Sequence, residues 1–80
     1  MDAIDQAEAA RVAAECLYEE TRAKWYKIIC KEWTVSIARV DAEIRLLRAD
    51  PDHELGQAWR AFDKAKLLYN GLRREEYRKP

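Results

Sequence analysis

The feature that most constrains this 80-residue chain is the lack of glycine or proline from Met1 through Asp50, followed by a break at Asp50-Pro51. A residue before proline disfavours helical geometry, whereas proline suits the first turn of a new helix. The sequence predicts an all-α fold, an antiparallel helical hairpin with a long first helix at about 3–49 and a shorter second helix at about 51–77. We expect Asp50 to cap the second helix, with Asp52 and Glu54 facing its positive end.

Charged residues alternate in blocks along the chain. The net charge is −4 over residues 1–23, +3 over 24–49, −3 over 50–63 and +4 over 64–80. A reversal of the chain at Pro51 sets the +3 block beside the −3 block, and the −4 block near the +4 block. The charge pattern therefore favours antiparallel helices.

Apolar residues recur at helical spacing in both predicted helices. In the second helix the spacing stays in phase through Gly71, so we expect this helix to continue past the glycine at a cost of about 1 kcal/mol. The alternative is that Asn70-Gly71 ends the helix, with Gly71 in the left-handed conformation. The stripe alternates steps of three and four residues, which is typical of a coiled-coil seam. Its members are Leu55, Ala58, Phe62, Ala65, Tyr69 and Leu72.

The predicted helices differ in length, and pairing them outward from Pro51 leaves residues 1–22 without a partner in the chain. Burial of one Leu or Ile side chain is worth roughly 1.5–3 kcal/mol, so we expect this segment to be covered. A second chain would cover it by dimerisation or association with another protein. The alternative is a bend near 20–24 that gives a three-helix bundle. The predicted interface residues are Ala7, Ala10, Ala14, Leu17, Tyr18, Thr21, Trp25, Ile28 and Ile29.

Residues that carry chemistry are scarce. His53 is the only histidine and Ser36 the only serine, and hairpin pairing places them far apart. Cys16 and Cys30, which we expect to be reduced and mostly buried, are too few with one histidine for a four-ligand zinc site. We therefore expect no enzyme activity, no catalytic residue, no metal or other cofactor and no small-molecule substrate.

A basic face is the basis of a second hypothesis. In the hairpin, basic residues of both helices come to the same end of the molecule, close to Tyr26. Basic residues interleaved with aromatic ones bind nucleic-acid backbones, so a small nucleic-acid-binding regulator is the alternative function. Because the chain is neutral overall, we place this alternative second. Its residues are Lys24, Lys27, Lys31, Arg73, Arg74 and Arg78.

The whole chain is expected to form a single helical domain, residues 1–80. No apolar run approaches the roughly 20 residues of a membrane span, and the acidic start differs from a signal peptide, so we expect a cytoplasmic protein without membrane contact. The layout is similar to that of small plasmid copy-control and phage accessory proteins, without a shared motif. We expect a small non-enzymatic interaction or regulatory protein, a phage or bacterial accessory protein that forms a homodimer or binds a host protein.

Overall fold

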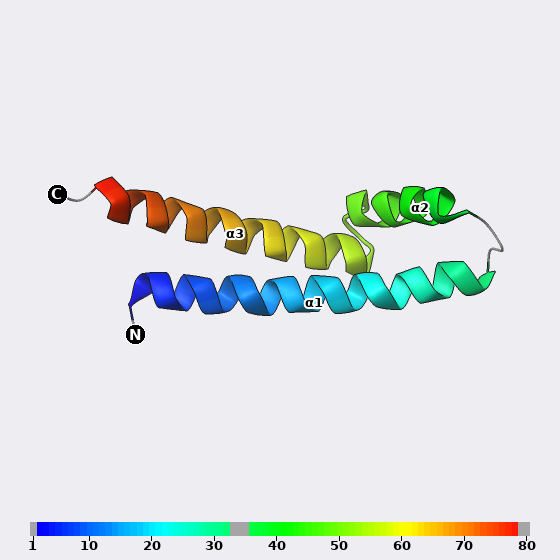
Figure 1. Cartoon of the computed structure of the whole chain (residues 1–80), viewed down its shortest axis with the longest axis horizontal. Coiled ribbons are helices and arrows are strands. Elements are labelled where there is room, and N and C mark those ends of the chain that lie inside the picture. Colours follow the sequence, from blue (N-terminus) through cyan, green and yellow to red (C-terminus); the bar gives the residue numbers. More distant parts are fainter. Residues whose placement is uncertain (1, 33–35, 79–80) are drawn as a thin grey trace.

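Three helices make up the chain in the computed structural model, which describes residues 2–32 and 36–78. They are α1 (Ala3–Glu32), α2 (Ile37–Ala49) and α3 (Glu54–Arg78), and no strand occurs among the described residues (Figure 1). The all-α prediction is confirmed. The last helix also continues past Gly71, as its unbroken apolar spacing predicted.

The first helix does not extend over 3–49, as the sequence had predicted. Ser36 has extended backbone angles, φ −61° and ψ 154°, and its carbonyl accepts the amides of Arg39 and Val40. The Ser36 side chain makes no cap hydrogen bond, so the new helix begins here on backbone bonds alone, without glycine or proline. Residues 33–35 lie outside the described residues. The alternative bend near 20–24 is also wrong, because α1 is continuous from Ala3 to Glu32.

The last helix begins at Glu54 and not at Pro51. Asp50 is extended, and its Oδ1 accepts the amide of Asp52 at 2.9 Å, which closes a local turn. The cap of α3 is His53, whose Nδ1 accepts the amide of Leu55 at 3.1 Å. The predicted cap, Asp50, thus stabilises the connection between helices, and the His53 side chain satisfies one orphan amide of α3, that of Leu55.

The chain reverses between α1 and α2, so that α2 and α3 both lie along α1 and antiparallel to it (Figure 1). The opening segment therefore has a partner in the chain. The Arg11 guanidinium lies 5.2 Å from the centre of the Tyr69 ring, and the Tyr18 ring lies 6.0 Å from that of Phe62. The prediction that residues 1–22 have no intrachain partner is wrong, because it placed the reversal at Pro51.

The complementary charge blocks nevertheless meet. Lys24 donates to Glu54 at 2.7 Å, which joins the +3 block to the −3 block. The acidic start of α1 lies beside the basic end of α3, where Ile4 and Arg73 line the same cleft. Opposite charges at these positions select the antiparallel pairing of α1 with α3.

The core lies where the three helices meet. Leu55 and Val40 are fully buried there, and Trp25, Leu47, Trp59 and Phe62 pack around the cluster. The buried cluster comprises Tyr18, Ile29, Val40, Ile44, Leu55 and Ala58.

Gly56 lets the start of α3 approach the connection from α2. A Cβ atom at this position would lie 1.8 Å from the carbonyl oxygen of Asp50, well inside van der Waals contact. Glycine is therefore required here by the close approach of two backbone segments.

Candidate interaction surface

The two long sides of the α1–α3 pair differ in character. On one side, cations lie over the aromatic rings of α3. Arg48, at the end of α2, lies 4.7 Å from the centre of the Trp59 ring, where α2 meets the start of α3 (Figure 1). Lys66 and Arg73 follow Trp59 at intervals of seven residues, so they lie on the same face of α3.

The opposite side is uncovered and mixes apolar with polar side chains. Leu17 and Thr21 of α1 line a shallow groove of about 280 Å³ there, together with four residues of α3: Glu54, Gln57, Ala58 and Ala61. Two helical turns further on, Ala10 and Leu68 continue the same face, because each lies seven residues from Leu17 or Ala61. Leu17 is 55% exposed and Leu68 is 61% exposed. The open face is defined here as Ala10, Leu17, Thr21, Ala61 and Leu68.

A polar cluster fixes one end of the open face. Glu54 Oε1 accepts hydrogen bonds from the Lys24 ammonium, at 2.7 Å, and from the indole N–H of Trp25. The bonds from Lys24 and then Trp25 lower the pKa of the Glu54 carboxyl. The Trp25 ring also packs edge-on against His53, with the ring centres 4.5 Å apart. The beginning of α3 is thereby tied to the middle of α1.

The predicted interface residues divide between the inside and the outside of the chain. Ala7, Tyr18 and Ile29 are buried within the chain itself. Ala14, Trp25 and Ile28 are half-buried, whereas Ala10, Leu17 and Thr21 lie on the open face.

Sequence reasoning missed Ala61 and Leu68, the contribution of α3 to the open face. Their signal was the same seven-residue interval that relates Ala10 to Leu17. These residues lie beside the stronger apolar stripe of α3, the one that faces α1, and that stripe alone was predicted.

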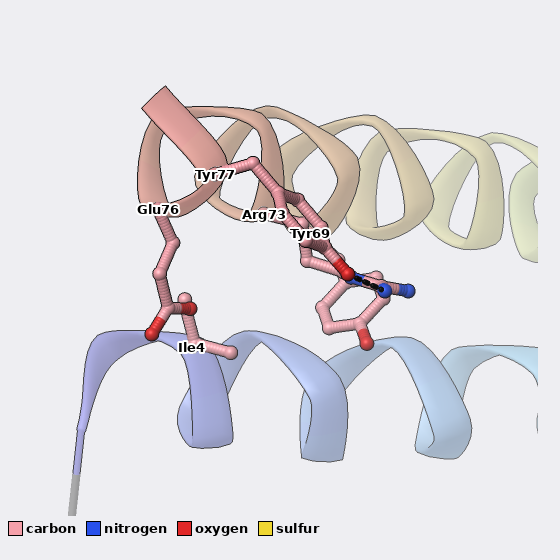
Figure 2. A pocket seen from close by; sticks show the side chains of 5 residues that line it. All are labelled: Ile4, Tyr69, Arg73, Glu76 and Tyr77. Carbon is pink, nitrogen blue, oxygen red and sulfur yellow. Dashed lines mark hydrogen bonds between the residues drawn. The ribbon is translucent and has the colours of Figure 1, made fainter. Parts of the chain in front are cut away.

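A second cleft, of about 500 Å³, lies between the start of α1 and the end of α3 (Figure 2). Arg73 donates to the Tyr77 hydroxyl at 3.2 Å, and its guanidinium lies 5.7 Å from the ring centres of both Tyr69 and Tyr77. The bond to Tyr77 raises the pKa of Arg73. In Figure 2, Glu76 extends from α3 toward Ile4 on α1. The aromatic surface that could attract an outside cation is thus used by the chain's own Arg73.

The predicted nucleic-acid residues do not form one surface. Lys24 is paired with Glu54 in the middle of α1, whereas Arg73 lies at the far end, beside Ile4. The reversal after α1, and not at Pro51, separates them. Lys27, Lys31 and Arg74 are exposed, and the side chain of Arg78 lies outside the described part of the chain.

Arginines gather elsewhere, between α1 and α2. Arg22, Arg45 and Arg48 line a groove of about 230 Å³ together with Asp41. The sequence signal for this cluster was the spacing of Asp41, Arg45 and Arg48 on one face of α2. The sequence prediction lacks this cluster because a single long helix over 3–49 keeps residues 37–49 away from Arg22.

The residues considered for chemistry lie apart. Cys16 and Cys30 are free thiols and both are exposed, contrary to the expectation that they are mostly buried. Both lie on the outer surface of α1, away from its seam with α3. His53 serves as a helix cap, and the described residues contain no group of three or more side chains suited to hold a metal ion. Within residues 2–32 and 36–78, no helix has the length and hydropathy needed to span a bilayer.

Comparison with protein-family models, with curated proteins and with solved structures finds no match to this chain.

Proposed function

We propose that this protein is a small, non-enzymatic helical interaction protein that binds a protein partner through its open face. The observation that carries the proposal is the amount of surface left uncovered. The chain exposes 6142 Å², whereas a compact folded monomer of this mass exposes about 5,000 Å². Its radius of gyration is 16.1 Å, compared with about 12 Å for a compact domain of this length.

The open face has the composition of a contact surface. Leu17 and Leu68 supply large apolar side chains, and the alanines between them let another helix approach closely. Single exposed apolar residues are common, whereas exposed apolar residues grouped on one face favour an interaction site. On the opposite side, Arg48, Lys66 and Arg73 lie over the aromatic rings of α3.

The proposal is tested with two matched double variants. Leu17→Asp with Leu68→Asp places charges on the open face, whereas Val12→Asp with Leu67→Asp places them on other exposed faces. Val12 and Leu67 are 45% and 62% exposed, so the two pairs are closely comparable in solvent exposure. We expect wild type and the control to bind the same protein partner, another copy included, and the open-face variant to lose it. Equal binding by all three, measured by quantitative capture and light scattering, would refute the proposal.

A second candidate function rests on the arginine groove. Arg22, Arg45 and Arg48 surround one acid, Asp41, so the groove is electropositive and suits a phosphate of a nucleic-acid backbone. The Trp59 ring beneath Arg48 orients that guanidinium.

This candidate is tested by fluorescence anisotropy with a labelled single-stranded RNA at about 50 mM salt. We expect Arg22→Ala with Arg45→Ala to weaken binding and to reduce its dependence on salt. Arg60→Ala with Lys64→Ala is the control of equal charge, because both residues are exposed on α3 and neither lines the groove. Binding that is absent in wild type, or equally weakened in both variants, excludes the groove as a nucleic-acid site.

A further inference from the structure

We infer that the partner of the open face is a second copy of this chain, related by a twofold axis parallel to the helices. In this dimer α1 of each copy lies on α3 of the other, and the two α1–α3 pairs form a four-helix bundle. The inference rests on the proposed function, because it names the partner of the same face.

The chain as a whole exposes enough surface beyond that of a compact monomer to form a dimer interface. The chain exposes 6142 Å², roughly 1,100 Å² more than a compact monomer of its mass. A standard stable interface buries about 800 Å² on each partner. The molecule measures 57 × 21 × 20 Å, so its open side has the length needed for such an interface. A second copy of the chain exposes the same face, so both partners would bury an equal area.

The shape of the open face is complementary to itself under this axis. Leu17 and Ala61 line the same groove and so lie at the same height along the pair. Ala10 and Leu68 lie two turns away, again at matching heights, because α1 and α3 are antiparallel. A twofold axis parallel to the helices preserves height, so Leu17 meets Ala61 of the second copy and Ala10 meets its Leu68. Each large side chain is thus placed against a small one.

Charge selects this axis over the other possible twofold. Residues 3–23 contain five acids and two bases, a net of −3, and residues 57–78 contain six bases and three acids, a net of +3. An axis perpendicular to the helices places α1 on α1 and α3 on α3, with like charges facing each other. The parallel axis places α1 on α3, so charge alternates around all four helices. Opposed potentials across an interface favour association, whereas like charges oppose it.

The first test is the oligomeric state of the full chain by sedimentation equilibrium. We expect wild type and the Val12→Asp, Leu67→Asp control to have twice the chain mass of 9.4 kDa. Leu17→Asp with Leu68→Asp should raise the dissociation constant at least about 100-fold, since each dimer loses four apolar contacts. A wild type that is monomeric at about 100 μM overturns the inference, because this concentration is well above the dissociation constants of typical specific dimers. Circular dichroism confirms that the helices of each variant remain folded.

The second test is disulfide trapping, which distinguishes the two axes without depending on a destabilising variant. In a Cys16→Ser, Cys30→Ser background, chains carrying Leu17→Cys alone are mixed with chains carrying Ala61→Cys alone. A mixed disulfide is expected, because the two side chains face each other across the proposed interface. Cross-linking of Leu17→Cys chains with Ala10→Cys chains, and not with Ala61→Cys chains, indicates the perpendicular axis and overturns the arrangement.

Failure of this inference is distinct from failure of the proposed function. A monomeric wild type that still binds another protein through Leu17 and Leu68 overturns only the second copy as partner. A wild type that neither self-associates nor captures another protein overturns the interaction surface itself.

Discussion

Two regions of this molecule are built from the same kinds of residue but differ in how fully they are buried. The three-helix end comprises residues 18–32 of α1, all of α2 and residues 54–60 of α3. The two-helix arm comprises residues 3–17 of α1 and 61–78 of α3. Six core residues cluster at the three-helix end, whereas among the described side chains of the arm only Ala7 is buried.

The difference shows what a third helix contributes. Two helices bury one seam between them, and in the arm this seam includes the small residues Ala7, Ala14 and Ala65. Arg11 also lies against α3, with an ion pair to Glu15 at 3.0 Å but with its buried Nε unpartnered. The arm therefore gains little from its own packing, which supports the proposal that its open face binds another protein.

The largest effect is expected from truncation of the best-buried side chain. Leu55→Ala should destabilise the fold by about 2–5 kcal/mol, because it leaves a cavity where three helices meet. The matched change in the arm, Leu72→Ala, should cost clearly less, since that residue is half-buried. Urea denaturation followed by circular dichroism measures both. Equal losses at the two sites would contradict the contrast between the regions.

The two glycines of α3 provide the next test, one in each region. Gly56→Ala should destabilise by about 1–3 kcal/mol, because its Cβ overlaps the backbone near Asp50. Gly71→Ala should stabilise by about 0.5–1 kcal/mol, because its Cβ meets nothing within 4 Å and alanine favours the helix. Thermal denaturation gives both signs, and stabilisation by Gly56→Ala would show that the junction of α2 and α3 is looser than described.

A smaller effect is expected at the cap of α3. His53→Ala removes the acceptor of the Leu55 amide and should cost about 1 kcal/mol. His53→Asn keeps a side-chain acceptor at this position, so most of the stability should be retained. The difference in denaturation midpoint between the two variants measures the cap apart from the ring contact with Trp25, which both variants lose.

The smallest effect concerns the pH dependence conferred by Glu54. The pKa of this carboxyl is lowered in the folded chain, so its contribution is present above the unfolded pKa and is lost as pH falls through the folded one. The difference in melting temperature between wild type and Glu54→Gln should therefore shrink below about pH 4. Because Glu54 is exposed, added salt should also reduce the difference at neutral pH. A gap that stays constant down to pH 2 would rule out this carboxylate as its source.

Much of the fold was predictable from local patterns. The 3-4 spacing from Leu55 to Leu72 gave the buried stripe of α3 and its continuation through Gly71. The position of the reversal was not predictable in this way, because Ser36 is a modest signal and Asp50-Pro51 a strong one. A proline ends a helix whether the chain then turns back or continues in the same direction, and here α3 continues alongside α1.

The open face was predictable only in part. Leu17, Ala10 and Thr21 belonged to the predicted interface because they lie on a regular apolar stripe. Ala61 and Leu68 did not, since their exposure depends on whether another segment of the chain packs on that side of the pair. No local property of α3 contains that information.

The sequence by itself determined that the chain is helical, that its helices pack antiparallel, and which stripe of α3 faces inward. These properties follow from the spacing of apolar residues, which acts over one or two helical turns, and from the net charge of successive blocks of the sequence. Only the tertiary structure decided where the chain reverses, that residues 2–22 are covered by α3, and which side of α1–α3 remains open. Those outcomes depend on the placement of α2, and that placement is set by side-chain packing among segments distant in the chain.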